Sequence, residues 1–301
     1  MILTYIVKDN KYMAIKDVLR QYFDMSQRFI RKLKVNKKIT LNGNISFFDQ
    51  KLNINDIIEI NINFNDNETS VVPTQIDLNI IYEDDALLVI NKQPKMTVHP
   101  SPNHFSTSLS NGVKFYYNNK GINSKIHLVN RLDKDTSGLV IFAKNEYIQE
   151  TLVKQMKTKD FYKEYYAIVE GNLEKHSGVI NAPIARKNGS IIEREVNPNG
   201  EIAITHYTVL EHLDSDNTLV KFVLETGRTH QIRVHSKHIG HSILGDTLYG
   251  TKSELITRQA LHSYITKFTH PITKKEIEFM APIPNDIEEV LKCKSIKKQK
   301  R

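Results

Sequence analysis

The residues best suited to chemistry lie in one short run, NRLDKDTSG, at positions 130–138. An apolar, β-prone segment follows at 139–144, so Asp133 stands where the chain enters a core strand. A carboxylate removed from water is costly unless a cation pairs with it, and Arg131 is close in sequence. The pattern indicates a catalytic carboxylate, although a solvated loop with an Asx-turn at Asp133 or Asp135 also accounts for the spacing.

Four stretches, in the same order along the chain, resemble motifs of the RluA/RluD family of pseudouridine synthases. The run at 130–138 contains the family's Arg-Leu-Asp-x-x-Thr-Ser-Gly pattern. The other stretches are KEYYA at 163–167, LETGRTHQIRVH at 224–235 with its continuation GDTLYG at 245–250, and ALH at 260–262. The resemblance covers roughly residues 76–285 and departs little from the family pattern, with Asn130 where His is common and Lys134 where Arg is frequent.

The resemblance implies an enzyme that isomerises uridine to pseudouridine in RNA without a cofactor. It implies Asp133 as the nucleophile and Arg233 as its cation partner, because a guanidinium stays protonated and can bind a carboxylate through two N–H bonds. It implies Tyr165 as a third catalytic residue, whose ring is the platform for uracil and whose hydroxyl can take part in proton removal. We expect the adjacent Tyr166 to point to the other face. Two routes stay open, since Asp133 could attack the anomeric carbon or the uracil carbon next to the glycosidic nitrogen.

Further substrate-binding residues are expected within the same motifs. They are Arg131, Leu261, Arg228, His230 and Gln231. By resemblance, Arg131 fills the space that the flipped nucleotide leaves, and we expect it to reach the cleft of Asp133 because side chains at i and i+2 of a strand share a face. Leu261 matches the family's apolar residue that packs beside the target base.

Three other patterns would indicate different chemistry, and each is incomplete. Histidines at steps of three within 235–241 could bind a metal on a helix, but Gly240 would interrupt that helix and no acid or cysteine lies nearby to complete the set. Asp133 and Asp135 share one turn, whereas a glycosidase needs carboxylates about 5–9 Å apart across a bond. The glycines within 227–245 form no phosphate-binding loop. We therefore expect neither a metal nor a small-molecule cofactor.

Charge and composition indicate a partner that is a polyanion. The chain has 301 residues, 40% of them hydrophobic, and a formal net charge of +8. Two runs, 28–38 and 292–301, each hold six lysines or arginines and no acid. The first run favours binding to RNA over a merely solvated face. For the second run, RNA binding and a solvated lysine-rich terminus are equal alternatives. The single cysteine, Cys293, excludes an intrachain disulfide. With no long apolar run and no signal peptide, we expect a cytoplasmic protein that does not interact with membranes.

The first 64 residues predict a small α/β unit. A strand is expected at 1–8, a helix at 12–23, and a second helix at 27–34 with Ser26 as its N-cap. A hairpin turn follows at Asn42-Gly43, and an alternating β segment covers 52–64. This order resembles the ribosomal-protein S-four type RNA-binding domain. Its expected RNA-binding cations are Arg28, Arg31, Lys32, Lys34, Lys37 and Lys38.

The rest of the chain predicts a linker at 65–75, a catalytic domain at 76–290 and a basic tail at 291–301. Strands are expected near Leu78–Lys92 and at 138–144, 164–170, 203–212, 218–225 and 275–280. Helices are expected at 106–119, 146–158, 229–239 and 284–291. Because the order is irregular, we predict an α+β fold with a mixed, mainly antiparallel sheet.

Two classes of function fit these observations. The first is an RNA pseudouridine synthase, with large-subunit ribosomal RNA favoured as substrate because the S-four type domain is typical of family members that act on it. Transfer RNA is the alternative substrate. The second class is a non-catalytic RNA-binding protein that assists ribosome assembly. We expect a monomer whose partner is RNA, free or within a ribosomal particle.

Overall fold

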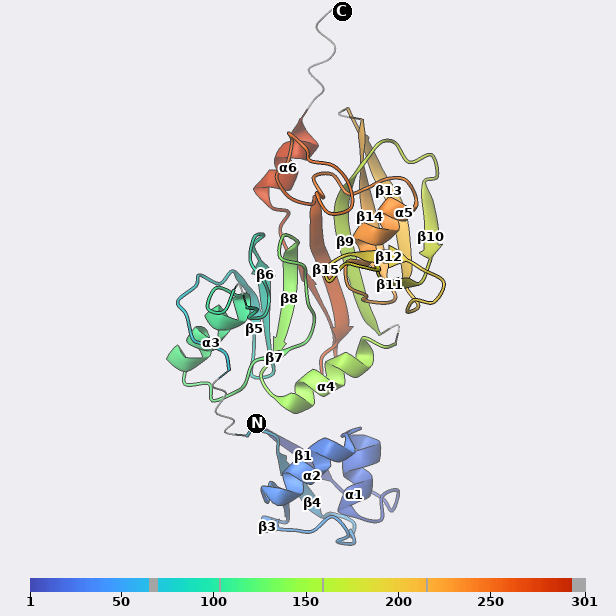
Figure 1. Cartoon of the computed structure of the whole chain (residues 1–301). Coiled ribbons are helices and arrows are strands. Elements are labelled where there is room, and N and C mark those ends of the chain that lie inside the picture. The colour runs from blue at the N-terminus through green and yellow to red at the C-terminus, as the bar shows by residue number, and fades with distance from the viewer. Residues whose placement is uncertain (65–69, 103, 159, 215, 294–301) are drawn as a thin grey trace, which may run out of the picture.

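A computed structural model describes residues 1–64, 70–102, 104–158, 160–214 and 216–293. The N-terminal unit forms a four-stranded antiparallel sheet in the order β1-β4-β2-β3, with its helices packed on one face (Figure 1). Its elements are β1 (Ile2–Ile6), α1 (Ile15–Asp17) leading into the π-helical turn η1 (Val18–Tyr22), α2 (Gln27–Val35), β2 (Ile39–Leu41), β3 (Asn44–Ile45) and β4 (Ile57–Asn61).

Local signals account for the boundaries of these elements. The Ser26 hydroxyl accepts a hydrogen bond from the Phe29 amide at 3.1 Å, which confirms the expected N-cap of α2. Asn42 and Gly43 have φ angles of 50° and 82°, as the tight turn between β2 and β3 requires. The expected strand at 52–64 is shorter, because only β4 pairs with its neighbours.

The second unit contains a ten-stranded mixed sheet, which confirms the predicted α+β class. Eight strands run in the order β10-β13-β14-β9-β15-β8-β6-β5, with β16 paired to β15 and β7 to β8. Every pairing in this sheet is antiparallel except that of β15 with β8. The strands are β5 (Ile80–Glu83), β6 (Leu87–Lys92), β7 (His127–Leu128), β8 (Ser137–Ala143), β9 (Phe161–Glu170), β10 (Ser177–Asn181), β13 (Ile204–Leu213), β14 (Asn217–Leu224), β15 (Leu261–Thr269) and β16 (Glu276–Met280).

The helices of this unit lie close to their predicted positions. They are α3 (Leu109–Asn119), α4 (Glu146–Gln155), α5 (Gln231–His238) and α6 (Asn285–Lys292), and a separate hairpin joins β11 (Ile184–Arg186) to β12 (Arg194–Val196). The sequence reading did not include β10, the β11–β12 hairpin or β15. The last of these is the central strand that joins the two halves of the sheet.

The start of β8 requires glycine. Gly138 has a φ angle of 108°, and a Cβ atom there would overlap the backbone of Ser263 on β15. This close approach lies where β8 and β15 pair in parallel. It places the residues just before β8 beside the first residues of β15.

Helix α4 is where the two units meet (Figure 1). Lys32 of α2 forms an ion pair with Glu146 at 2.9 Å, and the hydroxyl of Ser26 donates to Glu150 at 3.0 Å. The Tyr147 ring stacks on Phe29 with a centroid distance of 5.8 Å. The N-terminal unit is therefore held against the first turns of α4 by both polar and apolar contacts.

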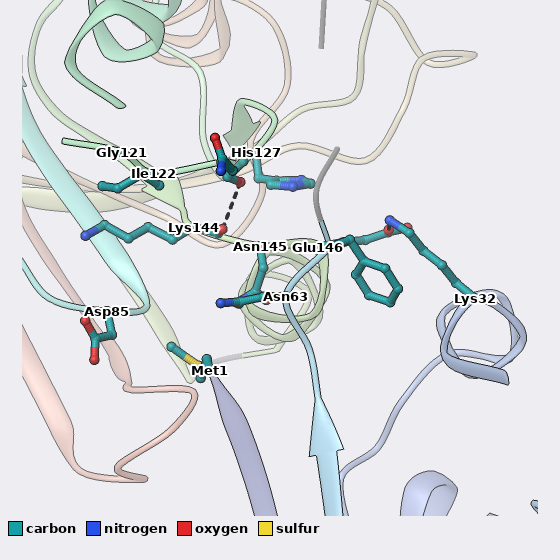
Figure 2. A pocket seen from close by; sticks show the side chains of 13 residues that line it. Met1, Lys32, Asn63, Asp85, Gly121, Ile122, His127, Lys144, Asn145 and Glu146 are labelled. Atoms are coloured by element: carbon teal, nitrogen blue, oxygen red, sulfur yellow. Dashed lines mark hydrogen bonds and ion pairs between the residues drawn. The ribbon is translucent and has the colours of Figure 1, made fainter. Parts of the chain in front are cut away.

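A polar cleft of about 450 Å³ opens beside this contact (Figure 2). Its walls include Lys32 and Phe64 from the N-terminal unit and Lys144 and Glu146 from the second unit. The expected linker lies partly outside the described residues, and its described part is anchored by a 2.7 Å hydrogen bond from the Asn111 amide to the Val72 carbonyl. No helix among the described residues is both long and apolar enough to cross a bilayer.

Candidate active site

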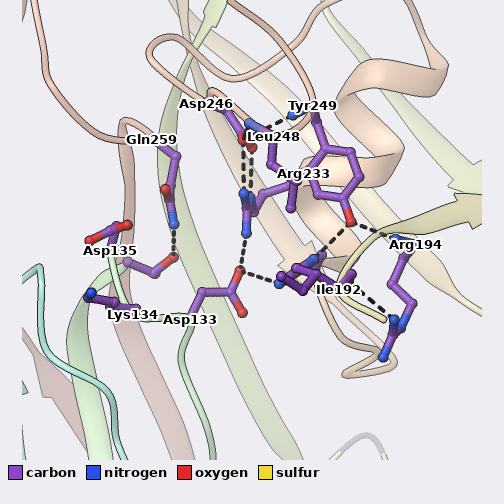
Figure 3. Close-up of polar contacts among 12 residues, drawn as sticks. Asp133, Lys134, Asp135, Ile192, Arg194, Arg233, Asp246, Leu248, Tyr249 and Gln259 are labelled. Atoms are coloured by element: carbon purple, nitrogen blue, oxygen red, sulfur yellow. Dashed lines mark hydrogen bonds and ion pairs between the residues drawn. The ribbon is translucent and has the colours of Figure 1, made fainter. Parts of the chain in front are cut away.

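Asp133 lies in an irregular turn between β7 and β8, and one of its carboxylate oxygens accepts a 3.0 Å hydrogen bond from Arg233 Nη1. Arg233 comes from α5, 100 residues further along the chain. Its remaining nitrogens, Nε and Nη2, bind the two oxygens of Asp246 at 2.7 and 2.8 Å (Figure 3). The predicted pair of Asp133 and Arg233 is thus present, and Asp246 completes it.

Arg233 is held in one orientation by this arrangement. Asp246 is fully buried, and the face of Tyr249 lies 5.0 Å from the Arg233 guanidinium carbon. Burial disfavours the charge of Arg233, but Asp246 and Asp133 outweigh it and hold the pKa of Arg233 above its usual value. With two carboxylates and one guanidinium, the group keeps one net negative charge, and it faces the pocket at Asp133.

Two buried basic side chains, Lys92 and Arg258, hold the turn that carries Asp133. Lys92 donates from Nζ to the carbonyl of Lys134 at 2.9 Å and to two further carbonyl oxygens. Arg258 donates to the carbonyl of Asp135 at 3.0 Å and binds Asp286 through two nitrogens. These contacts fix the turn while leaving the Asp133 carboxylate free to meet a substrate.

Tyr165 lies on β9 and lines the same pocket as Asp133. Burial raises the pKa of Tyr165 to about 12, so its hydroxyl stays neutral at physiological pH and can donate a hydrogen bond. Tyr166 points to the opposite face, as predicted, where its ring stacks on Tyr264 at 4.1 Å. Strand alternation therefore separates a pocket tyrosine from a structural one.

His230 approaches Asp133 from the other side. Its Nδ1 lies 2.8 Å from the hydroxyl of Tyr249, and its Nε2 lies 3.8 Å from the Asp133 carboxylate. Burial lowers the pKa of His230 more than Asp133 raises it, so the imidazole is neutral near pH 7. Its left-handed backbone, with a φ angle of 59°, places the ring at the entry of α5.

These side chains surround a small open pocket of about 70 Å³. It is lined by Arg131, Leu132, Asp133, Thr136, Tyr165, Leu224, Arg228, His230, Gln231, Ile232, Arg233 and Leu261. All eight residues expected at the catalytic and substrate sites are therefore brought together. Leu261, buried at the start of β15, supplies part of the apolar wall.

The prediction that Arg131 reaches the pocket from the same strand face as Asp133 is wrong. Residues 129–136 form no strand, so Arg131 does not share a strand face with Asp133. The turn instead leaves the Arg131 side chain exposed at the pocket, next to Asp133. An irregular turn accounts for its reach better than strand alternation does.

Gln231 and Arg228 bind the protein as well as lining the pocket. The Gln231 amide donates to Ile204 and Thr205 and accepts from the Arg228 backbone at 2.9 Å, so its polar atoms are already engaged. Arg228 donates to the Ile202 carbonyl and pairs with Glu201. We assign Gln231 the task of holding the loop before α5 in place.

The patterns that indicated other chemistry have structural explanations. His235 contacts Thr205 and the Ala182 carbonyl, each at 2.9 Å, and Gly240 lies just beyond the end of α5 rather than inside it. The carboxylate of Asp135 points away from the Asp133–Arg233 pair (Figure 3). The two aspartates therefore do not face one another across a shared site.

The six cations expected to bind RNA lie on or just after α2, away from this pocket (Figure 1). Lys32 is paired with Glu146, and Arg28 lies 3.6 Å from the same carboxylate. Arg31, Lys34 and Lys37 are exposed. With Arg28, four of the six cations are thus presented to solvent, while Lys32 and Arg28 also contact the second unit. The basic tail lies almost entirely outside the described residues.

Two residues of the site, Asp246 and Tyr249, were not assigned a role from the sequence. Both belong to the family-like stretch at 245–250, which was a usable signal. Their task depends on the fold, because Asp246 binds Arg233 and Tyr249 contacts both Arg233 and His230.

The chain is similar to several known proteins. The family model described as RNA pseudouridylate synthase matches residues 86–238. The uncharacterized RNA pseudouridine synthase YjbO of Bacillus subtilis is 45% identical, over 72% of this chain and 76% of the relative. The ribosomal large subunit pseudouridine synthase D of Vibrio cholerae is 35% identical, over 96% of this chain and 93% of the relative.

A solved structure shares the fold at lower sequence similarity. Human RNA Pseudouridylate Synthase Domain Containing 1 aligns with a TM-score of 0.57 and 24% identity, covering 68% of this chain and 83% of the human chain. The similarity to the Vibrio cholerae protein extends over nearly the whole chain, including the N-terminal unit.

Proposed function

The chain belongs to the RNA pseudouridylate synthase family, and on this premise we propose that it isomerises specific uridines of large-subunit ribosomal RNA with Asp133 as the nucleophile. The observation that carries the proposal is the Asp133 carboxylate at the pocket, bound at 3.0 Å by an arginine that a second, buried aspartate holds in place. Covalent catalysis by a carboxylate divides one difficult step into two easier ones.

The reaction is an isomerisation and consumes no second substrate. The bond between the ribose anomeric carbon and the uracil nitrogen breaks, the base turns, and a carbon–carbon bond forms in its place. The hydrogen on the uracil carbon that forms the new bond leaves as a proton, and the released uracil nitrogen takes up a proton. Asp133 can begin this sequence at either the sugar or the base, and both routes use the same pocket.

The remaining pocket residues supply orientation rather than further chemistry. Tyr165 offers an aromatic face for the flipped uracil, and its hydroxyl, neutral at pH 7 because burial raises its pKa to about 12, can form hydrogen bonds with the base. Arg131, exposed at the pocket, is suited to fill the gap that the flipped nucleotide leaves in the RNA. Leu261 completes the apolar wall against the base.

Ribosomal RNA is proposed as substrate on two grounds. Relatives named as ribosomal large subunit pseudouridine synthase D align with 92–96% of this chain in several bacteria. The exposed cations of α2 also supply charge for binding RNA outside the catalytic pocket. We further propose that the enzyme acts as a monomer in the cytoplasm, where ribosomal RNA is made.

Tritium release tests this function directly. Purified large-subunit ribosomal RNA and transfer RNA, both labelled on the uracil carbon that forms the new bond, are incubated with the enzyme in parallel. We expect release from ribosomal RNA, and none from Asp133→Asn, which should bind RNA within a few-fold of the wild type. Asp135→Asn is the matched control, because its carboxylate points away from the pair, and it should retain turnover.

Each other outcome would contradict a different part of the proposal. Release from transfer RNA alone would change the substrate, and release by Asp133→Asn would exclude that residue as nucleophile. Tight, salt-sensitive binding with no release from free RNA or from ribosomal particles would indicate a non-catalytic assembly factor instead.

A further inference from the structure

Lys163 is a buried cation to which the proposed reaction gives no task. It lies on β9 two residues before Tyr165, so the two side chains point to the same face of the sheet. Only 6% of the Lys163 surface is exposed. The neighbouring strand β14 ends at Leu224, which lines the catalytic pocket. Lys163 does not itself line the pocket, but it lies on β9 beside the end of β14 and shares a sheet face with Tyr165, which does line it.

The Lys163 ammonium has no hydrogen-bond acceptor, carboxylate or aromatic ring as partner within the described part of the chain. The other buried lysine near the site, Lys92, differs in this respect because it donates to three carbonyl oxygens. Burial alone lowers the pKa of Lys163, with no neighbouring charge to oppose it. The stem of Lys163 is buried while its Nζ atom still reaches solvent, so a ligand that approaches from that side can replace water as the partner of the ammonium.

Gly227 leaves one side of this ammonium uncovered. A Cβ atom at Gly227 would lie 3.6 Å from Lys163 Nζ and within 4 Å of no other atom in the described residues. The Gly227 N–H has no acceptor of its own among those residues. The next residue, Arg228, lines the pocket. Gly227 and the Lys163 ammonium thus lie together, next to a residue that lines the catalytic pocket.

We propose that Lys163 binds a phosphodiester group of the RNA directly next to the target uridine, with the Gly227 N–H as a second donor. This inference rests on the proposed function, which places a flipped nucleotide in the adjacent pocket. A flipped nucleotide carries a phosphate on each side, and lysine binds phosphate as a point charge. A neutral uracil carbonyl would leave the buried charge uncompensated, whereas a phosphate would neutralise it.

The test uses the full-length enzyme and synthetic RNA that spans a mapped target uridine. Three RNAs are compared: one with all phosphates, and two with a single neutral methylphosphonate linkage on either side of the uridine. Wild type, Lys163→Met and Lys163→Arg are measured for dissociation constant and for tritium release. Lys163→Met keeps the length of the side chain and removes the charge, while Lys163→Arg keeps the charge.

We expect wild type to lose about tenfold in affinity at one of the two neutral linkages, since a hydrogen bond to a charged group is worth about that factor. Lys163→Met should lose the same factor on the all-phosphate RNA and nothing further at that linkage. Lys163→Arg should stay within a few-fold of wild type. Gly227→Ala, which covers the ammonium, should weaken binding to the all-phosphate RNA only.

The assignment would be overturned if the neutral linkages lowered the RNA affinity of Lys163→Met as much as that of wild type, because the lysine would then contact neither phosphate. A fall in turnover by Lys163→Met with unchanged affinity would likewise overturn it, because the lysine would then act on the base. If Lys163→Met fails to fold, the wild-type and Gly227→Ala measurements decide alone. Failure of wild type to release tritium would count against the proposed function rather than against this contact.

Discussion

The catalytic centre and helix α2 both place arginine beside carboxylates, but in opposite surroundings. Arg233 exposes 8% of its side chain and uses three nitrogens on Asp246 and Asp133. Arg28 of α2 leaves 86% of its side chain exposed, although Glu146 lies 3.6 Å away. Removing one partner of a buried pair is strongly destabilising, whereas exposed pairs contribute little. The buried ion pairs of Arg233 therefore fix the geometry of the catalytic centre. The exposed ion pair of Arg28 with Glu146 is weak enough for salt or RNA phosphates to displace.

The largest effect on this comparison should come from Asp246→Asn. The change leaves the buried Arg233 with a weakened partner, so we expect the free energy of unfolding to fall by about 3–5 kcal/mol. Turnover should fall about 100-fold, because a misplaced Arg233 no longer orients Asp133. Urea denaturation and tritium release measure the two effects. Glu193→Gln, which breaks an exposed pair with Lys187, is the control. If the two variants were equally stable, the buried ion pair would contribute no more to stability than the exposed one.

The next largest effect concerns the pH dependence of stability, which we attribute to a buried histidine. His262 is fully buried on β15, where burial lowers its pKa from 6.5 to about 4. The unfolded chain takes up this proton near pH 6.5 and the folded chain only near pH 4. Stability from this group is therefore complete above pH 6.5 and falls by about 3 kcal/mol as the pH drops to 4.

His262→Gln should remove this dependence. Guanidinium denaturation at several pH values between 4 and 7 would show a flatter stability curve for the variant than for wild type. Parallel curves for the two proteins would mean that other groups dominate the acid response.

A smaller effect is expected when the exposed cations Arg31, Lys34 and Lys37 are replaced together by glutamine. Each phosphate contact contributes about 0.7 to the slope of log affinity against log salt on single-stranded RNA, so the slope should become shallower by about 2. Turnover at saturating RNA should not change. Lys16→Gln is a control in the same unit, because Lys16 already pairs with Asp49. An unchanged slope would exclude this face of α2 from the RNA interface.

The smallest effect should come from Glu146→Gln, which weakens the contact between α2 and α4. Partly exposed ion pairs contribute at most about 1 kcal/mol, so global stability should barely change. Hydrogen exchange should become faster in α2 and in the first turn of α4, while RNA affinity rises slightly because a negative charge beside the basic residues of α2 is removed. Slower exchange, or weaker RNA binding, would show that the pair serves the interaction with RNA directly.

Local signals in the sequence were read well, and contacts between distant segments were not. The Ser26 cap, the turn at Asn42-Gly43 and the position of α5 depend on neighbouring residues, and each was predicted. The pairing of Asp133 with Arg233 spans 100 residues and was found only through resemblance to a family.

The parts that were missed depend on tertiary structure. Asp246 is part of the site because the fold brings it to Arg233, and the residues next to it in the sequence do not by themselves predict that contact. The strand β15 was overlooked, although it lies between β9 and β8 at the centre of the sheet. Glu146 reads as an ordinary acid at the start of a helix, and its contact with Lys32 across 114 residues appears only in the structure.

The seven residues of β8 connect the turn of Asp133 at one end with Lys144, Asn145 and Glu146 at the other. At about 3.3 Å per residue this strand spans roughly 20 Å, and its fully buried side chains make it stiff. Under the proposed function, β8 would fix the distance between an RNA segment bound at α2 and the Asp133 carboxylate. Among many uridines of similar local sequence, the one chosen would be the one lying at this distance from the bound segment.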